Sequence, residues 1–309
     1  MSSSPHPASL PALHRAPWPS FSAVLELLKP ITWFPPMWAY GCGIVSAGGP
    51  GFADVWATLG GIFLAGPLLC GTSQAVNDWY DRHVDALNEP HRPIPSGRVP
   101  GRWGLAIAIL WSVLSLAVAS LLGLAVFAAA TLGLALAWAY SAPPLRLKRN
   151  GWAGNTAVGL CYEGLPWFTG AAALLGAFPD LRLVSLALLY SLGAHGIMTL
   201  NDFKSIEGDR VMGVRSLPAQ LGEAKAAKLA CWVMALAQLA VVGLLLFWGA
   251  LLHAALITAL LAIQLLLMRR LIASPRQRAP WYNGTGVTLY VLGMLVSAFA
   301  LRTLTNGGG

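Results

Sequence analysis

Three aspartates, Asp78, Asp81 and Asp85, lie where an apolar segment of membrane length runs into a basic loop. On a helix, spacings of three and seven residues place their carboxylates within roughly 60° of one face. Carboxylates gathered at a membrane edge repel one another unless a positive ion lies between them, and the hard cation that prefers oxygen ligands is Mg²⁺. The spacing therefore predicts a magnesium site, with a magnesium-bound diphosphate as its ligand.

A second acidic cluster, Asp202, Glu207 and Asp209, repeats this arrangement after another apolar segment. Asp202 and Asp209 are seven residues apart and nearly eclipse each other on an ideal helix, whereas Glu207 faces roughly 140° away from Asp209 and is the weaker candidate. A solvated helix end, with Arg82 pairing with Asp78, is the plain alternative, but it does not explain the duplication. We therefore expect two carboxylate faces to converge on one site.

The composition is that of a polytopic membrane protein. Of the 309 residues, 56% are hydrophobic and only 10% are charged, and the mean hydropathy is +0.63, whereas a soluble domain carries about a quarter of charged residues. Windows of roughly 20 apolar residues suffice to cross a bilayer. The sequence predicts an all-α protein with about nine transmembrane helices around a cytoplasm-facing cavity, at residues 31–47, 55–76, 103–122, 124–141, 152–175, 184–200, 229–249, 251–268 and 284–301.

The positions of lysine and arginine predict the orientation, because basic loops stay on the cytoplasmic side. With nine spans and the N-terminus inside, all but Arg182 and Arg302 of the 20 basic residues fall inside. The protein is expected in the inner membrane, which can be the cytoplasmic or the intracytoplasmic membrane. The N-terminus and both acidic clusters are expected on its cytoplasmic face. The net charge of +8 then needs no nucleic-acid partner, and the sequence gives no protein partner.

The chain is expected to form one domain with short tails. Residues 1–28, rich in proline and serine, predict a disordered cytoplasmic tail without a signal peptide, residues 29–303 a single transmembrane domain, and residues 304–309 a short flexible tail. The repeated acidic ends suggest two similar halves of four helices and one additional helix. The four cysteines show no CxxC pairing, so neither a disulfide framework nor a zinc site is indicated.

Both acidic segments resemble motifs of a known family. NDWYDRHVDALNEPHRPIPSGR, with Asn77, Asp78, Asp81 and Asp85, resembles the first Asp-rich motif of the UbiA superfamily of intramembrane prenyltransferases, and NDFKSIEGDR resembles the second. The resemblance extends from about residue 27 to residue 302. The segments KPITWFPPMWAYGCG, YSAPPLRLKRNGW, CYEGLPWFTGAA and PWYNGTGVTLYVLGM resemble the chlorophyll and bacteriochlorophyll synthase branch, and the last of them is nearest to the bacteriochlorophyll synthases.

The resemblance implies Mg²⁺-dependent transfer of a geranylgeranyl or phytyl group from its diphosphate to the propionate of a (bacterio)chlorophyllide. The implied metal ligands are Asn77, Asp78, Asp81, Asp85, Asp202 and Asp209, of which Asp78, Asp81 and Asp202 are the candidates for catalysis. The cations expected on the diphosphate are Arg146, Lys148 and Lys204, with Tyr140 as a hydroxyl donor. Arg146 and Lys148 could equally serve only as a topogenic loop, and topogenic or lipid-facing roles are favoured for Arg92, Arg98 and Arg102.

Two ionisable residues inside predicted spans need partners, because a charge in the membrane is costly. Glu163 could line the acceptor cavity or hydrogen-bond to a neighbouring helix. His195 could ligate the magnesium of a chlorin, although an interhelical hydrogen bond is favoured. Trp167, like some other tryptophans, could flank a flat macrocycle, so Glu163 and Trp167 are the candidates for the acceptor wall.

Two other functions remain open from the sequence. A prenyltransferase for another acceptor, such as a quinone precursor or haem, would use the same diphosphate site. A membrane transporter for a divalent ion would instead favour acidic residues spread along a transmembrane path, whereas both clusters here are expected at one face.

Overall fold

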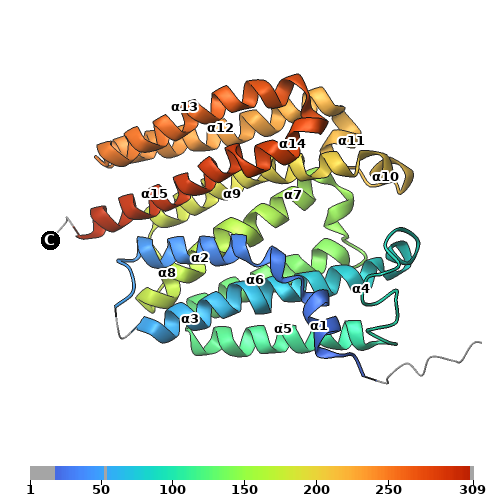
Figure 1. The fold of residues 1–309 in the computed structure, drawn as a ribbon. Helices are drawn as coiled ribbons and strands as arrows, with labels where there is room; N and C mark the ends of the chain where they lie inside the picture. Colours follow the sequence, from blue (N-terminus) through green and yellow to red (C-terminus); the bar gives the residue numbers. More distant parts are fainter. Residues whose placement is uncertain (1–17, 52–53, 307–309) are drawn as a thin grey trace, which may run out of the picture.

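The computed structural model describes residues 18–51 and 54–306, which form helices and no β-strand (Figure 1). The all-α prediction is confirmed. In chain order the elements are α1 Phe21–Leu28, η1 Pro30–Thr32, α2 Phe34–Ser46, α3 Val55–Phe63, η3 Leu64–Cys70, α4 Gly71–Asn88, α5 Trp103–Leu121, α6 Leu124–Ser141, η4 Leu147–Arg149, α7 Gly151–Gly159, η5 Leu160–Gly164, α8 Leu165–Leu175, α9 Leu181–Asn201, η6 Asp202–Lys204, α10 Ile206–Val211, α11 Leu217–Leu221, α12 Glu223–Phe247, α13 Leu251–Ala273, α14 Pro275–Gly284 and α15 Gly286–Asn306.

Seven helical stretches in the described part of the chain are long and apolar enough to cross a membrane, so the protein is an integral membrane protein. The expected count of nine is not confirmed. The windows at residues 31–47 and 152–175 correspond to α2, which has only 13 residues, and to the α7–η5–α8 stretch, and neither is among the seven. The seven stretches are Val55–Asn88, Trp103–Leu121, Leu124–Ser141, Leu181–Lys204, Glu223–Phe247, Leu251–Ala273 and Pro275–Thr305.

The boundaries of both predicted tails need correction. Residues 21–28 are helical, because Ser20 caps α1 through a hydrogen bond from the Ala23 backbone N–H and the helix packs Leu27 and Leu28 into the protein. At the other end α15 continues through Asn306. The remaining tail residues, 1–17 and 307–309, lie outside the described residues.

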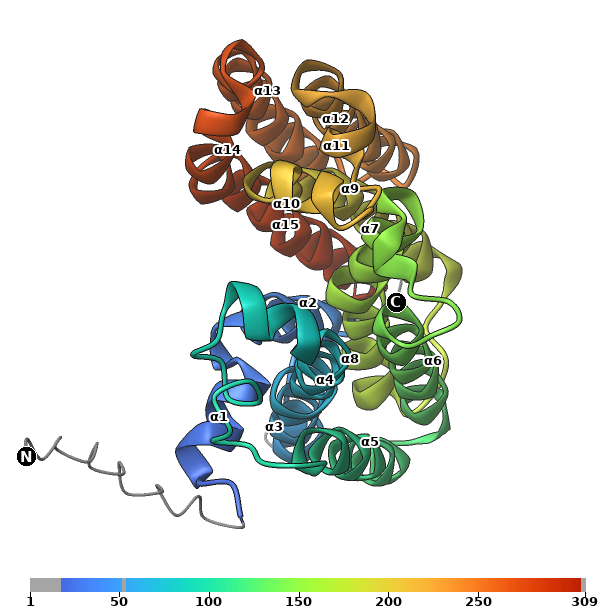
Figure 2. The same cartoon turned by 90° about the vertical axis from the view of Figure 1, so that its right-hand side faces the viewer.

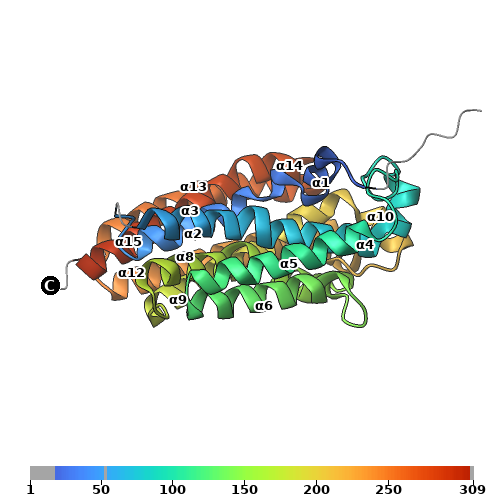
Figure 3. The same cartoon turned by 90° about the horizontal axis from the view of Figure 1, so that it is seen from below.

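The long helices pack on one another mainly in chain order, from α4 through α5, α6, α8, α9, α12 and α13 to α15. The helix α2 packs on both α8 and α15, and Figure 2 shows the bundle from one end. The Trp38 indole of α2 donates to the backbone carbonyl of Val291 in α15 (3.3 Å) across 253 residues of sequence. Figure 3 shows that the ends of α4 and α9, with the loops after them, lie at the same end of the bundle.

Glycine permits the close contact between α2 and α8. A Cβ on Gly43 would lie 2.1 Å from the Trp167 carbonyl oxygen, and one on Gly170 would lie 2.1 Å from the Tyr40 carbonyl oxygen. Small residues let helix backbones approach in this way inside membranes. The backbone-to-backbone contact between α2 and α8 therefore requires glycine at positions 43 and 170.

We expect Gly170→Ala to destabilise the protein by about 1–3 kcal/mol, because the new methyl group overlaps a backbone atom that cannot rotate away. Thermal unfolding of the detergent-solubilised protein measures the change. Gly41→Ala is the matched control: Gly41 lies on α2 and a Cβ there meets no atom within 4 Å. Equal unfolding temperatures for both variants would contradict the assigned contact.

Candidate active site

The first acidic motif lies on a straight helical surface. Val55 to Asn88 form one continuous helical stretch of 34 residues, in which the π-helical segment η3 contains Pro67; proline removes a backbone donor, and π segments appear where the regular pattern is interrupted. Beyond η3, α4 is regular, so its aspartates share one face as predicted. The side chains of Asp78 and Asp85 are almost fully buried.

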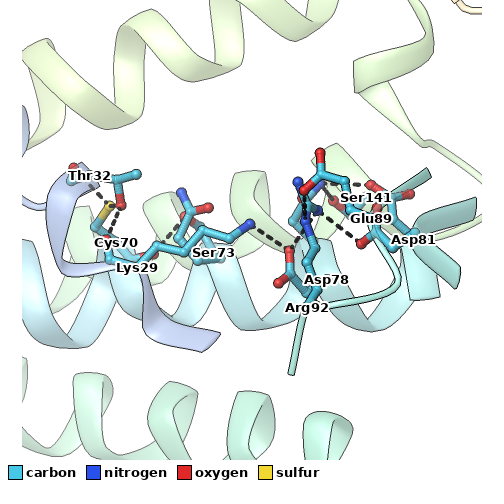
Figure 4. Close-up of polar contacts among 12 residues, drawn as sticks. Lys29, Thr32, Cys70, Ser73, Asp78, Asp81, Glu89, Arg92 and Ser141 are labelled. Atoms are coloured by element: carbon cyan, nitrogen blue, oxygen red, sulfur yellow. Dashed lines mark hydrogen bonds and ion pairs between the residues drawn. The ribbon is translucent and has the colours of Figure 1, made fainter. Parts of the chain in front are cut away.

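Basic residues from three different segments neutralise this motif. Lys29 Nζ lies 2.6 Å from Asp78 Oδ1. Arg92, in the loop after α4, reaches Asp85 Oδ2 at 2.9 Å and Asp78 Oδ1 at 3.5 Å, and it also bonds to Glu89. Figure 4 shows Lys29 and Arg92 approaching Asp78 from opposite directions. Burial of carboxylates is costly unless they are paired, and these cations supply the pairing.

Lys148 neutralises the third carboxylate. Its Nζ lies 2.5 Å from Asp81 Oδ1 and 2.6 Å from Asp81 Oδ2. The lysine belongs to the short helix η4, which follows Arg146, a residue with φ of 42°; this left-handed turn directs the chain back toward α4. Burial lowers the pKa of the Lys148 ammonium, and the adjacent Asp81 carboxylate opposes that shift. Lys148 is therefore a partly desolvated cation held at the motif.

The second motif differs from the prediction of one helical face. The α-helix α9 ends at Asn201, Asp202 to Lys204 form the 3₁₀-helix η6, and α10 begins only at Ile206. Asp202 and Asp209 thus do not lie on one ideal helix. Asp209 is nevertheless buried, and the Ser205 hydroxyl donates to its Oδ2 at 3.0 Å.

The other charged residues of the second motif are exposed. Glu207 points outward and forms an exposed pair with Arg276 of α14 at 2.5 Å, in agreement with its weaker standing as a ligand. Lys204 is also exposed, but its charge acts on Asp202. Of this cluster, Asp202 and Asp209 are therefore the residues that can serve a buried site.

A cavity of about 390 Å³ lies beside the two motifs. Asn77 of α4, Tyr140 of α6 and Asn201 of α9 line it, so all three helices contribute polar groups. Asn77 donates to Asp81 and Asn201 directly precedes Asp202, so Tyr140 shares this cavity with residues next to both acidic clusters. Other lining residues are Thr32, Pro35, Ser73, Gln74, Leu136, Ala137, Ala157, Val158, Cys161, Tyr162 and Met198.

A second, smaller cavity of about 50 Å³ lies next to the first. The two cavities share Ser73, Ala137, Cys161 and Tyr162. The smaller one is lined mainly by apolar groups, among them Ala65, Leu69, Ala129, Leu165 and Pro166. The site thus combines polar groups beside the acidic motifs with apolar lining, as an amphiphilic ligand with a charged head requires.

The donor set fits a hard divalent cation, although it is not assembled as a metal cage. In residues 18–51 and 54–306, no group of three or more His, Cys, Asp or Glu side chains stands at metal-binding geometry. The oxygen donors are nevertheless of the kind that Mg²⁺ prefers. Asp78 Oδ2 is buried without a hydrogen-bond partner, so this carboxylate oxygen is available, while Lys29, Arg92 and Lys148 contact other oxygens of Asp78, Asp81 and Asp85.

Two predicted acceptor-wall residues line neither cavity. Trp167 is fully buried; its indole donates to the Ser46 hydroxyl at 2.9 Å, and its ring lies 5.5 Å from that of Tyr190. Glu163 is buried within the π-helical segment η5, and its Oε2 has no hydrogen-bond partner. Trp167 is therefore a core residue, and Glu163 is not among the residues that line the ligand space, although the neighbouring Tyr162 is.

His195 is buried beside Trp152, with ring centroids 5.5 Å apart. Its Nε2 has no hydrogen-bond partner in the described structure. The imidazole nevertheless has a hydrogen bond to the backbone of Trp152 in α7, so the expected interhelical hydrogen bond is present.

Three residues at the site were not assigned to it from the sequence, namely Lys29, Arg92 and Asn283. Lys29 and Arg92 counted there only as topogenic charges, yet both contact Asp78. Asn283 of α14 bonds to Asn201. For Lys29 and Asn283 the sequence carries no signal, because their partners lie 49 and 82 residues away. Arg92 follows Asp85 by seven residues, so helical spacing would have favoured the pair if α4 had continued.

Comparison with known proteins identifies the family. The profile of the UbiA prenyltransferase family matches residues 33–301, which is most of the chain. The protein belongs to the UbiA prenyltransferase family. As a UbiA-family member it is a prenyltransferase, which excludes the divalent-ion transporter considered from the sequence.

Several UbiA relatives are similar over nearly their whole length. The chain is 62% identical to the bacteriochlorophyll synthase 33 kDa chain of Cereibacter sphaeroides over 95% of this chain and 97% of that protein. It is 57% identical to the Rhodobacter capsulatus counterpart, over 93% and 95%. Identity to the chlorophyll synthase of Avena sativa is 38%, over 89% and 75%. The resemblance stated from the motifs is thus confirmed.

Solved UbiA structures share the fold. A structure concerning digeranylgeranylglyceryl phosphate synthase superposes with a TM-score of 0.72 at 20% identity, covering 90% of this chain and 98% of that chain. A UbiA homolog from Archaeoglobus fulgidus bound to GPP and Mg²⁺ gives a TM-score of 0.70 at 21% identity, covering 91% and 99%. At these identities the likeness establishes the fold alone.

Proposed function

We propose that this protein transfers a geranylgeranyl or phytyl group from its diphosphate to the propionate of a (bacterio)chlorophyllide. The observation that carries the proposal is the cavity of about 390 Å³ beside the two acidic motifs, with a smaller apolar cavity next to it. The identity of 62% to a bacteriochlorophyll synthase supports the choice of acceptor, and the solved UbiA homolog with GPP and Mg²⁺ supports a prenyl diphosphate as donor.

The oxygen ligands proposed for Mg²⁺ are those of Asn77, Asp78, Asp81 and Asp85 on one side and Asp202 and Asp209 on the other. When bound, the metal would neutralise the charge that accumulates on the departing diphosphate. The remaining task of the chain is to hold the diphosphate. Lys148 and Lys29 already stand within salt-bridge distance of Asp81 and Asp78, so small side-chain shifts would bring them onto phosphate oxygens, joined by Arg146 and Lys204.

The reaction requires no protein nucleophile. The bond between C1 of the prenyl group and the diphosphate oxygen breaks, and a propionate oxygen forms the new bond to C1. The carboxylate is already deprotonated at neutral pH, so no general base is needed, and inorganic diphosphate leaves with the electron pair of the broken bond. Tyr140 lines the cavity, where its hydroxyl could donate to an oxygen of either substrate.

The apolar groups of the two cavities suit the prenyl tail. Ala137, Cys161 and Tyr162 line both cavities, so a chain whose head is at Asn77 would pass them. The chlorin, which is far larger, would approach from the lipid between helices. A quinone precursor or haem as acceptor would leave the diphosphate site unchanged, so the acceptor assay separates these alternatives.

Detergent-solubilised protein should be incubated with Mg²⁺ and geranylgeranyl diphosphate, in parallel with chlorophyllide a, bacteriochlorophyllide a and 4-hydroxybenzoate. We expect the prenyl ester of one or both chlorins, identified by mass, and no prenylated 4-hydroxybenzoate. A product from 4-hydroxybenzoate alone would refute the proposed acceptor while leaving the prenyltransferase activity intact.

We further propose that the N-terminus and the acidic ends of α4 and α9 face the cytoplasm. Cysteines introduced at Ser96, Arg149 and Gln277, in a background without the native cysteines, should react with a membrane-impermeant thiol reagent only from the cytoplasmic side. The reason is the concentration of lysine and arginine in these loops. Labelling of the Ser96 position from the opposite side would overturn the orientation, and a cysteine at Leu251, at the other end of the bundle, serves as the control for external labelling.

A further inference from the structure

An asparagine pair joins the last part of the chain to the second acidic motif. Asn283, near the end of α14, donates from Nδ2 to Oδ1 of Asn201 at 2.8 Å. Asn201 is the last residue of α9, directly precedes Asp202, and lines the larger cavity. The Oδ1 atom of Asn283 is buried without a hydrogen-bond partner in the described structure. Asn283 thus fixes an amide that faces the ligand space.

The first motif has an asparagine in the corresponding position, but there the NH₂ group of the amide, and not its carbonyl oxygen, makes the hydrogen bonds within the protein. Asn77 directly precedes Asp78, and its Nδ2 donates to Asp81 Oδ2 at 3.2 Å and to the Ser141 hydroxyl at 3.3 Å. The carbonyl oxygen of Asn77 is therefore the end left for a ligand. In Asn201 the carbonyl oxygen accepts from Asn283, so its NH₂ group is the end left for a ligand.

The present contact of that NH₂ group is weak. Asn201 Nδ2 lies 3.7 Å from the Met198 sulfur, and a thioether is a poor acceptor. Met198 lines the same cavity, so the donor end of the amide is directed toward the ligand space. An oxygen atom of a ligand would be a stronger acceptor, and an anionic oxygen stronger still.

The acceptor substrate supplies such an oxygen. Its carboxylate must approach a region that contains Asp81, Asp202 and Asp209, all of which repel it. A neutral N–H donor can hold a carboxylate there without competing with a metal ion for the aspartates. We propose that Asn201 donates from Nδ2 to the carboxylate of the acceptor substrate and that Asn283 is the positioning residue that sets the direction of this donor.

This assignment rests on the proposed function, and it competes with two plainer roles. Asn201 could be a metal ligand through Oδ1, as proposed for Asn77, or the pair could serve only to tie α14 to α9. The three roles differ in which substrate responds when the amide is changed. A donor to the acceptor affects the KM of the chlorin, a metal ligand affects the Mg²⁺ dependence, and a structural tie affects stability and both substrates together.

Asn201→Asp replaces the NH₂ group by an oxygen of the same size, and Asn201→Leu removes the donor without adding a charge. We expect both variants to raise the KM and the equilibrium dissociation constant for chlorophyllide by about 10- to 100-fold, which is the usual worth of a hydrogen bond to a charged group. The KM for geranylgeranyl diphosphate and the Mg²⁺ concentration for half-maximal activity should stay within about twofold. Quenching of chlorophyllide fluorescence gives the dissociation constant without turnover.

Asn283→Leu should raise the chlorophyllide KM by about 3- to 10-fold, because Asn201 remains present but its amide is free to rotate. Gln277→Ala, on the exposed face of the same helix α14, is the matched control and should leave both KM values unchanged. An unfolding temperature equal to that of the wild type shows that Asn283→Leu retains the fold. A lowered unfolding temperature with equal effects on both substrates would instead show a structural tie and overturn the inference.

The proposed function and the proposed role of Asn201 can be refuted separately. If the wild-type enzyme esterifies chlorophyllide and Asn201→Asp leaves the chlorophyllide KM unchanged, the inference is overturned alone. A higher Mg²⁺ requirement in Asn201→Leu, with unchanged chlorophyllide binding, would assign Asn201 to the metal. If the wild type prenylates no chlorin, the proposed function fails and the inference fails with it.

Discussion

Asp78→Ala, Asp81→Ala and Asp202→Ala should each reduce prenyl transfer by about 100-fold or more. Each change removes an oxygen donor from the site where negative charge accumulates on the leaving diphosphate, and loss of one oriented electrostatic partner typically costs that much in rate. Turnover is measured with saturating geranylgeranyl diphosphate, chlorophyllide and Mg²⁺. EDTA should stop the wild-type enzyme, and added Mg²⁺ should restore it.

Asp54→Ala provides a matched control for this series. Asp54 is the N-cap residue of α3, at the opposite end of the same continuous helical stretch that carries Asp78. The same substitution there removes an aspartate from the helix without touching the site, so turnover should remain near that of the wild type. Near-normal turnover of any of the three site variants would show that the assigned carboxylates do not hold the metal.

Lys148→Ala should raise the KM for the prenyl diphosphate by about tenfold or more and leave the chlorophyllide KM nearly unchanged. Lys148 is a partly buried ammonium that contacts both oxygens of Asp81, and a charge-assisted hydrogen bond to phosphate is worth about 1.5–3 kcal/mol. Initial rates with one substrate varied at a time give the two KM values. Direct binding of the diphosphate substrate is needed as well, because KM equals affinity only when chemistry is slow.

Arg149→Ala separates a specific role of Lys148 from a general effect of charge. Arg149 is the next residue, carries the same charge and is exposed, so its loss changes the basic character of the loop equally. The topogenic interpretation of this loop predicts equal effects of the two variants on insertion and on activity. A rise in the prenyl-diphosphate KM confined to Lys148→Ala would support the site assignment.

The part of the site that the sequence predicts best is the part that depends on one regular helix. Asp78, Asp81 and Asp85 share a face because α4 follows α-helical spacing without interruption. The same reasoning fails for Asp202 and Asp209, because the helix breaks at η6. A hydrogen bond from Ser205 to Asp209 then sets the geometry, and no periodicity rule foresees such a local contact.

Long-range partners could not be predicted from spacing. Lys29 reaches Asp78 only because α1 packs on α4, and Asn283 meets Asn201 only because α14 packs on α9 and η6. Hydropathy windows likewise detect apolar runs and not helix lengths, which is why residues 31–47 suggested a full span although α2 has 13 residues. Hydropathy also does not tell which of two adjacent residues lines a cavity, and here Tyr162 of η5 lines it whereas Glu163 does not.

The burial of Trp167 also changes the role that is assigned to this residue. The sequence suggested a wall for a flat macrocycle, but the ring fills the core between α2 and α9, where truncation to alanine removes packing worth about 3–5 kcal/mol. The indole bond to Ser46 belongs to the same contact region as the close approach at Gly43. Loss of activity in a Trp167 variant would therefore report on folding before it reported on substrate recognition.

The contact between α2 and α15 bears on how the protein is made. Trp38 enters the membrane early in synthesis, whereas its hydrogen-bond partner Val291 follows 253 residues later. At about 5–20 residues per second, roughly 13–50 s separate the two. During this interval the α15-facing side of α2 is exposed to lipid or to the insertion machinery, so the contact between α2 and α15 forms only after nearly the whole chain has been translated.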